Sequence, residues 1–338
     1  MDSVIRAYAH GVEIEKLGSP DRKTLVVLGA GASRGASFAG GLLQPPVDRD
    51  FFQILQMSKT GRTDDARSLL EHVRKAYGPA LNIGMETVFS NLDAAKTFAQ
   101  EVKIDPGPTV SWPEKMIDNF RRVLPQLLGE TIGDFECEHH LALARRLKTI
   151  DNVISLNYDC LIDRALCKAS GSRFAAKRGG YGVQVASGGA NWRGTAKGRA
   201  PQGSITLLKL HGSLNWAGNA SPLPLRTEIY DEVPEGVIQP PLTNKPVTAE
   251  PFRTVWREAR RSVRSARRLI LVGYSMPIAD GLVRSLLWTD LTSNLDEVIV
   301  AEPDSGTRAR HVEFFTRLAD RPKVFVFSSF AELAAVLG

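Results

Sequence analysis

The sequence predicts a doubly wound α/β fold, a parallel sheet of about six strands with helices on both faces. Six short, almost continuously apolar runs recur along the 338 residues, and stretches with helical periodicity stand between several of them. Such runs are typical of parallel strands that are buried on both faces. They cover residues 24–28, 152–156, 205–210, 268–272, 297–301 and 323–327.

The first two runs are separated by more than a hundred residues, far too many for one crossover helix. Helical periodicity at residues 64–77, 84–101 and 113–128 fills this interval, which is divided by Gly78-Pro79 and by a Pro-Gly-Pro segment at 106–108. We therefore expect a helical insertion module over residues 45–148. The sheet domain would then be discontinuous, with residues 1–44 and 149–338.

A glycine-rich turn, Gly29-Ala30-Gly31-Ala32-Ser33, directly follows the first run. Such a turn lets backbone amides approach a phosphate, and a helix that starts there favours a negative charge. A complete dinucleotide fingerprint has a third glycine where this chain has Arg34. By itself, the turn fits either a Rossmann-like phosphate loop or an ordinary tight turn.

Polar side chains follow the next two runs. Asn157 and Asp159 come after the second run, and His211 follows the third. In open α/β sheets the carboxyl ends of the strands border the ligand crevice, so we expect these residues near the glycine turn. His211 has an ordinary pKa of about 6.5, which suits proton transfer, although many such histidines are structural. Asp159 fits a ligand contact and a cap of the following helix equally well.

The fourth and fifth runs also end in candidate ligand contacts. Gly273 and Ser275 are expected to approach a phosphate or a ribose, and Glu302 to accept hydrogen bonds from ribose hydroxyls. Glu302 competes with Asp304 as the cap of a helix that begins near Pro303.

Residues 273–277 also begin like the nucleophile elbow of α/β-hydrolases. Pro277 replaces its last glycine, and His311 is the only later histidine. We therefore place this hydrolase interpretation below the nucleotide-binding one.

Five segments in order resemble signatures of the sirtuin-like family: 29–33, 157–159, 210–212, 271–275 and 298–302. The resemblance implies that NAD+ binds as a substrate in a cleft bordered by a helical module. It also implies that Asn157 positions the attacking water and that His211 accepts a proton. The implied NAD+ contacts are Gly29, Ala30, Gly31, Ser33, Asp159, Gly273, Ser275 and Glu302.

The chain departs from the deacetylases of that family in two places. It cannot build their zinc ribbon, because its three cysteines, Cys137, Cys160 and Cys167, all precede His211. Residues 40–52 also lack the family's Gly-Ile-Pro-Asp-Phe-Arg spacing. With Tyr158 between Asn157 and Asp159, the chain resembles the bacterial branch that consumes NAD+, often in antiphage defence.

We therefore predict an NAD+ glycohydrolase that yields nicotinamide and ADP-ribose or a cyclic product. One alternative is an NAD-dependent protein deacylase or ADP-ribosyltransferase. Another is a noncatalytic NAD-binding subunit that assembles with an ATPase or nuclease. Because an unrestrained hydrolase would be toxic, we expect the activity to be held in check, either by a closed homo-oligomer or by an insertion that blocks the cleft.

The composition is that of an ordinary globular protein with a net charge of +6. Arginines at 253, 257, 260, 264 and 267 form a basic stripe along one predicted helix face, which we interpret as solvated rather than as a surface for nucleic acid. The sequence contains neither an apolar run of about 18 residues nor a signal-peptide core, so we expect a cytoplasmic protein without a membrane contact. We expect no metal, because Cys137, His139 and His140 make an incomplete ligand set.

Overall fold

The computed structural model describes most of the chain: residues 4–5, 22–36, 43–102, 112–133, 135–170, 173–175, 179–183, 204–216, 238–239, 247–248, 250–277, 280–291, 295–318 and 322–337. The description below concerns these residues. From their Gly, Arg, Lys and Pro content, residues 170–203 and 218–246 are expected to form surface loops, one of which would cover the cleft. Most of both segments lies outside the described residues.

All strands run parallel in one seven-stranded sheet with the order β1-β7-β6-β5-β2-β3-β4. The strands are β1 (Val4–Ile5), β2 (Thr24–Leu28), β3 (Asn152–Ser155), β4 (Thr206–Lys209), β5 (Arg268–Val272), β6 (Glu297–Ala301) and β7 (Lys323–Phe327). Without the two-residue edge strand β1, the order is the 3-2-1-4-5-6 arrangement of Rossmann-like sheets. The predicted fold class is therefore confirmed, with β1 as an unpredicted addition.

The order of the strands reverses between β2 and β5. From β2 the chain adds β3 and β4 on one side, and it then returns to place β5 on the other side of β2. At such a reversal the connections leave toward opposite sides and open a crevice at the carboxyl ends of the strands. The glycine turn after β2 and the turn after β5 lie at this point.

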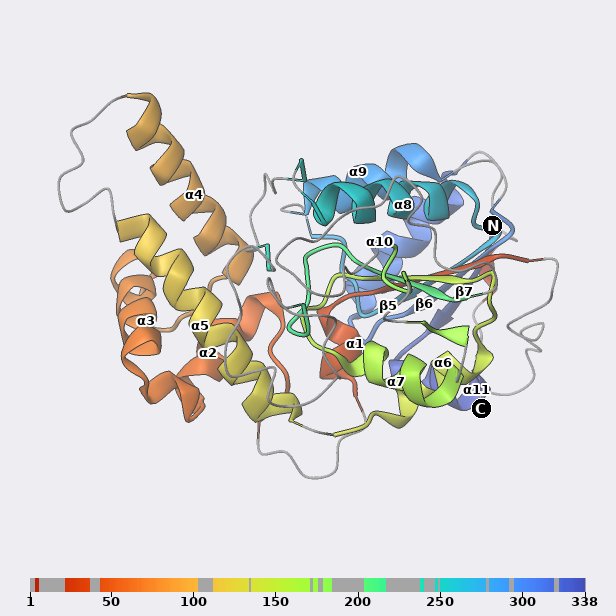
Figure 1. The fold of residues 1–338 in the computed structure, drawn as a ribbon, viewed down its shortest axis with the longest axis horizontal. Helices are drawn as coiled ribbons and strands as arrows, with labels where there is room; N and C mark the ends of the chain where they lie inside the picture. Colours follow the sequence, from red (N-terminus) through yellow and green to blue (C-terminus); the bar gives the residue numbers. More distant parts are fainter. Residues whose placement is uncertain are drawn as a thin grey trace.

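Helices cover both faces of the sheet (Figure 1). One face carries α8 (Phe252–Arg264), α9 (Gly281–Asp290) and α10 (Ser305–Thr316), and the other carries α6 (Glu138–Arg146), α7 (Leu161–Ser170) and α11 (Phe330–Leu337). Most strand side chains between the two layers are buried, and the apolar helix faces pack on them. This double cover explains why the strand runs are apolar almost without alternation.

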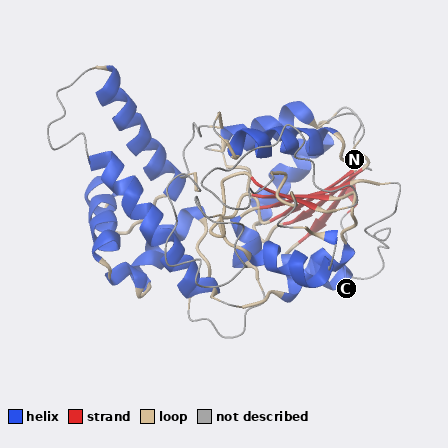
Figure 2. Cartoon of the chain, viewed as in Figure 1, coloured by secondary structure: helices blue, strands red, loops and turns tan. Residues whose placement is uncertain are grey.

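A second group of helices stands beside the sheet and has its own apolar core (Figures 1 and 2). It contains the 3-10 turns η1 (Asp48–Asp50) and η2 (Thr60–Arg62), with α2 (Phe51–Met57), α3 (Asp64–Tyr77), α4 (Met85–Glu101) and α5 (Trp112–Ile132). Phe51, Phe89 and Phe120 pack ring to ring at its centre. The helix α6 instead contributes to the core beside the sheet. The domain boundaries at 44/45 and 148/149 stay a prediction.

The basic stripe on α8 is neutralised by acidic neighbours. Arg260 and Arg264 both pair with Asp290, at 2.8 and 3.0 Å, and Arg253 pairs with Glu250 at 2.9 Å. These arginines are largely exposed, so each pair contributes little to stability. The pairing favours a solvated helix face over a surface for nucleic acid.

No helix among the described residues is long and apolar enough to cross a membrane. None of the three cysteines forms a disulfide. Burial raises the pKa of Cys160 to about 12 and that of Cys167 to about 11, so both thiols stay protonated near neutral pH.

Candidate functional site

One cavity of about 830 Å³ opens at the carboxyl ends of β2, β3, β5 and β6. This volume lies within the range of about 300–1,000 Å³ that is usual for small-molecule and cofactor sites. The sheet supplies one wall, and the helical group supplies the opposite wall through η1 and residues such as Met85 and Leu124. All ten residues that the sequence analysis singles out line this cavity: Gly29, Ala30, Gly31, Ser33, Asn157, Asp159, His211, Gly273, Ser275 and Glu302.

The glycines also hold two turns together, a role that the sequence did not predict. The amide of Gly31 donates to the carbonyl of Gly273 at 2.9 Å, and the amide of Gly29 donates to Val272 at 3.0 Å. A Cβ on Gly31 would lie 2.7 Å from the Cα of Gly273, and one on Gly273 would lie 2.2 Å from the amide nitrogen of Ala32. Glycine is needed here for backbone-to-backbone contact, and these two amides are already used inside the protein.

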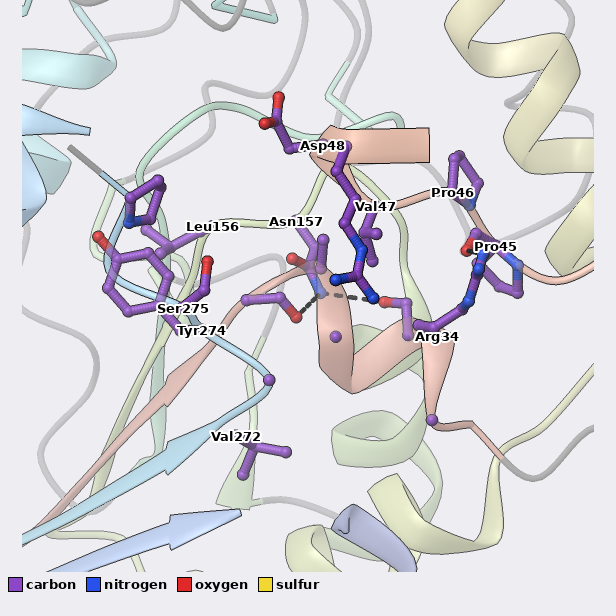
Figure 3. A pocket seen from close by; sticks show the side chains of 18 of the residues that line it. Arg34, Pro45, Pro46, Val47, Asp48, Leu156, Asn157, Val272, Tyr274 and Ser275 are labelled. Carbon is purple, nitrogen blue, oxygen red and sulfur yellow. Dashed lines mark hydrogen bonds between the residues drawn. The ribbon is translucent and has the colours of Figure 1, made fainter. Parts of the chain in front are cut away.

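The helix α1 (Ala30–Arg34) is only five residues long. Its dipole is correspondingly small, because few peptide units are aligned. Arg34, which occupies the place of the third glycine, donates to the carbonyl of Pro45 at 2.8 Å and to the carboxylate of Asp50 at 2.5 Å. It thereby fixes the segment that leads into η1 against the glycine turn (Figure 3).

Asn157 is oriented by two hydrogen bonds. Its Nδ2 donates to the carbonyl of Gly29 at 2.9 Å and to Oγ of Ser33 at 3.0 Å (Figure 3). A carbonyl oxygen can only accept, so these bonds fix which end of the amide is the nitrogen. Because both amide hydrogens are donated inside the protein, Oδ1 is the atom that the side chain has left for a ligand, and it can only accept.

Asp159 extends this set of hydrogen bonds beyond Ser33. One of its carboxylate oxygens accepts from Oγ of Ser33 at 2.6 Å, and the other accepts from the amide of Leu161 at 3.0 Å, at the start of α7. The side chain is 4% exposed. Of the two interpretations left open by the sequence, the structure shows the contact with the helix start, and a hydrogen-bonded chain runs from Asn157 through Ser33 to Asp159.

His211 also lines the cavity and is 5% exposed. Its Nδ1 is 3.1 Å from the carbonyl oxygen of Leu156. This oxygen can only accept, so Nδ1 carries the proton and Nε2 is the basic nitrogen of the neutral ring. The ring packs beside Tyr158, whose hydroxyl donates to the carbonyl of Gln239 at 2.7 Å.

Glu302 follows β6 at the far side of the cavity. Burial raises the pKa of its carboxyl group, and the amide of Asp304, which donates to Oε1 at 3.2 Å, opposes this effect. Asp304, not Glu302, caps α10, because its side chain accepts from the amide of Thr307 at 3.0 Å. Glu302 is therefore not needed as the helix cap.

The turn after β5 carries backbone strain. Gly273 and Met276 both have positive φ angles, of 57° and 51°. A positive φ is unfavourable for methionine and is usually held by surrounding contacts at functional sites. One such contact comes from His311, whose pKa burial lowers to about 4 and whose Nε2 is 2.8 Å from the carbonyl of Tyr274. This hydrogen bond gives His311 a structural role and weakens the nucleophile-elbow interpretation.

Sequence reasoning missed several groups that the fold brings to this cavity. Asp280 lies beside His211, while Asp48 and Glu86 come from the helical group. Asp48 accepts from the amide of Glu86 at 2.7 Å at the start of α4, and burial raises the pKa of its carboxyl group. These acids carry no motif, so only the packing of distant segments reveals them.

A buried ion pair supports the floor of the site. Lys209, the last residue of β4, is fully buried and donates to the carbonyl oxygen of Asp159 and to the carboxylate of Asp163, the latter at 3.1 Å. Burial lowers the pKa of Lys209, but the neighbouring acidic groups, Asp163 first and Asp159 with it, together outweigh this effect and raise it. Tyr181 donates to the second oxygen of Asp163 at 2.7 Å. The network fixes the loop that carries Asn157 and Asp159.

Within the described part of the chain, no group of three or more His, Cys, Asp or Glu side chains is arranged to hold a metal ion. No protein-family model matches the sequence, and no curated protein matches it significantly.

Solved structures with a similar fold include a Sir2 homologue bound to NAD, with 17% identity, coverage of 94% of this chain and 88% of that chain, and a TM-score of 0.40. A Sir2–p53 peptide–NAD+ complex has 14% identity, coverage of 93% and 91%, and a TM-score of 0.38. A Sir2 enzyme bound to a propionylated peptide has 14% identity, coverage of 93% and 91%, and a TM-score of 0.37. The activity of this chain has to be inferred from its own residues.

Proposed function

We propose that the chain is an NAD+ glycohydrolase that cleaves the bond between nicotinamide and ribose. The observation that carries this proposal is the convergence of Asn157 and His211 in a cavity that is also lined by the glycine turn and Glu302. The cavity can accommodate a dinucleotide, with Glu302 accepting from the adenosine ribose hydroxyls. Ala30 and Ser275 supply donors for the pyrophosphate and ribose, since the amides of Gly29 and Gly31 and the hydroxyl of Ser33 are already used.

The chemistry needs little activation of the leaving group, because the nicotinamide of NAD+ is already cationic. The bond from C1′ of the ribose to the ring nitrogen breaks, its electron pair stays on the nitrogen, and neutral nicotinamide leaves. The remaining sugar cation is attacked by water. Oδ1 of Asn157 accepts a hydrogen bond from that water, which directs a lone pair of its oxygen toward C1′.

His211 takes the proton that the attacking water loses. As the new bond from oxygen to C1′ forms, the proton moves to Nε2 and later passes to solvent. One NAD+ and one water thus give nicotinamide, ADP-ribose and a proton. Positioned general bases of this kind typically contribute about 10²- to 10⁴-fold in rate. If a ribose hydroxyl attacks in place of water, the product is cyclic and His211 takes the hydroxyl proton.

Tyr158 within the motif at 157–159, the spacing of residues 40–52 and the lack of a cysteine-based ribbon in the sequence support a role in antiphage defence by depletion of NAD+. In this proposal the protein works in the cytoplasm as a homo-oligomer, with an ATPase or nuclease as a candidate partner. Bacteria that carry the gene should lose NAD+ after phage infection, whereas bacteria with a His211→Ala variant should keep it. Equal NAD+ loss in both strains would contradict this role.

The test of the activity is product analysis by chromatography and mass spectrometry. Purified protein, alone and co-expressed with its genomic neighbours, is incubated with NAD+ in the presence and absence of an acetylated lysine peptide. We expect nicotinamide and ADP-ribose, linear or cyclic, at the same rate with and without peptide. Turnover that requires the peptide and yields acetylated ADP-ribose would indicate a deacylase. Binding of NAD+ without turnover under every condition would indicate a noncatalytic subunit.

A further inference from the structure

Asp280, which follows the turn after β5 in the sequence, lies close to the basic nitrogen of His211. It directly precedes α9, is 2% exposed and makes no side-chain hydrogen bond that caps the helix. Its Oδ1 lies 3.8 Å from Nε2 of His211. Its Oδ2 accepts from the hydroxyl of Tyr274 at 3.2 Å. A buried carboxylate therefore has one oxygen near the imidazole, and its other oxygen accepts a hydrogen bond from a tyrosine.

The direction of the imidazole decides what this carboxylate does. Because Nδ1–H donates to the carbonyl of Leu156, the lone pair of the neutral ring is on Nε2, 3.8 Å from Oδ1 of Asp280. A lone pair and a carboxylate repel each other, whereas a proton on Nε2 turns the contact into an attraction. Asp280 thus favours the protonated ring, which is the form that exists after His211 has accepted a proton.

We propose that Asp280 is a positioning residue that stabilises protonated His211, and that Tyr274 holds Asp280 in place for this role. The role of Asp280 in catalysis rests on the proposed function, whereas the contact between Asp280 and His211 exists whether or not the protein catalyses a reaction. In the hydrolysis, the proton from the attacking water resides on Nε2 while its charge faces Asp280, and it then passes to solvent. Asp280 neither contacts the reacting atoms nor consumes another reactant.

The other titratable groups around His211 leave Asp280 as its direct charged neighbour. Burial raises the pKa values of Tyr158 and Tyr274 well above the ordinary range, so both hydroxyls stay neutral. Glu86 of α4 adds a negative charge that acts on both tyrosines, and Arg284 of α9 adds a positive charge that acts on Tyr274. Among the ion pairs of the described residues, Asp280 has an oxygen 3.8 Å from Nε2 of His211.

The first experiment is an NMR titration of the histidine side chains in the full-length protein. His211→Gln identifies the resonance, and the titration is then repeated in Asp280→Asn. This substitution removes the charge but keeps an oxygen that can accept from Tyr274. Since an opposite charge at this distance commonly shifts a pKa by about one to three pH units, we expect the His211 midpoint to fall by about one pH unit or more.

Asp290→Asn is the matched control. Asp290 lies at the other end of α9, is 4% exposed and pairs with Arg260 and Arg264 outside the cavity. It should leave the His211 midpoint unchanged, although it loses two ion pairs. A midpoint in Asp280→Asn equal to that of the wild type would overturn the proposal, and so would an equal fall in both variants.

Tyr274→Phe keeps the proposal testable if Asp280→Asn does not fold. Without the tyrosine hydroxyl, Asp280 is no longer held beside Nε2, so the His211 midpoint should fall, though by less than in Asp280→Asn. An unchanged midpoint would contradict the role of Tyr274. In an active preparation, Asp280→Asn should also lower kcat far more than it changes KM and should shift the acidic limb of the pH–rate profile to lower pH. A titration result without any turnover would leave the contact established and the proposed function refuted.

Discussion

The two ends of the sheet both bury charged side chains, but they satisfy them differently. At the amino ends, Arg268 and Glu297 are register partners on β5 and β6, and their side chains form a 2.7 Å ion pair. Arg22 adds a second 2.7 Å contact to Glu297. Asp151 accepts from the amides of Thr24 and Lys148, at 2.8 and 2.7 Å. Each charge at this end faces other groups of the protein.

At the carboxyl ends, the polar side chains are held on one side and face a cavity on the other. Asn157 is anchored by Gly29 and Ser33, and His211 by the carbonyl of Leu156. The comparison teaches that burial of a polar group does not identify a site. What distinguishes the functional end is that the anchors fix the orientation of each group and leave one atom directed at the space for a ligand.

Adding a methyl group at the contact between the two glycine turns should have the largest effect on stability. In Gly273→Ala the Cβ would lie 2.2 Å from backbone atoms of the other turn, at a φ of 57°. Because backbone atoms on both sides cannot yield separately, we expect a loss of at least about 4 kcal/mol of stability. Denaturant unfolding measures this loss.

Gly306→Ala in α10 is the control for the glycine substitution, since its Cβ would make only ordinary contacts, the nearest at 3.5 Å. It should leave the protein as stable or more stable by up to about 1 kcal/mol. Equal losses in both variants would show that the two turns are not packed as described.

The amino-end ion pair should matter for stability and not for activity. Arg268→Ala leaves the buried carboxylate of Glu297 with only its partly exposed partner Arg22, so we expect a loss of about 3–5 kcal/mol. Turnover per folded molecule should stay at the wild-type level.

Arg267→Ala is the matched exposed case, because Arg267 pairs with Asp296 at 2.9 Å near the surface. It should cost no more than about 1 kcal/mol. A large loss of turnover per folded Arg268→Ala molecule would contradict the division between the two ends.

His311 should make stability depend on pH. Burial holds its pKa in the folded protein at about 4, below the value of 6.5 for the free side chain. The unfolded chain therefore binds more protons between these values, and stability falls as the pH drops from 6.5 toward 4. Between pH 7 and pH 5 this effect amounts to about 2 kcal/mol.

Unfolding at both pH values in wild type and His311→Gln measures this contribution, because other groups cancel in the difference. Glutamine can still donate to the carbonyl of Tyr274 but does not titrate. We expect the variant to lose about 2 kcal/mol less than the wild type on acidification. The same pH dependence in both proteins would show that His311 is not buried as a neutral ring.

Ser33 links Asn157 to Asp159, and its removal should have the smallest effect on stability. Ser33→Ala deletes one donor and one acceptor, which costs about 1 kcal/mol. Because Asn157 keeps its bond to Gly29 but loses the second one, turnover should fall by about tenfold through kcat. Steady-state kinetics separates this effect from a change in KM, and a variant with wild-type kcat would show that Gly29 alone orients the amide.

Much of the fold could be predicted from the sequence because its signals are local. Four of the six predicted strands have the observed bounds, and the helix predicted at 64–77 matches α3. β1 is only two residues long, which is too short for a recognisable pattern. The placement of α6 beside the sheet also escaped prediction, since its apolar face would fit either core.

The sequence predicted which residues would lie near the candidate site, but it predicted only some of the contacts that they make. Its ten residues could be found because the carboxyl ends of parallel strands meet at one edge of a sheet. The glycines were assigned to a phosphate, whereas their contact with the second turn depends on β5 lying next to β2. Asp280 and Glu86 could not be found, because their contacts join segments far apart in the sequence and follow no spacing rule.

The most direct test of the account measures NAD+ turnover and NAD+ binding together in Asn157→Ala and His211→Ala. If these side chains perform the chemistry described, turnover falls by at least about 100-fold in each variant, while calorimetry gives an NAD+ affinity close to that of the wild type. Thermal unfolding verifies that both variants are folded. Wild-type turnover in either folded variant would contradict the claim that this cavity hydrolyses NAD+ through Asn157 and His211.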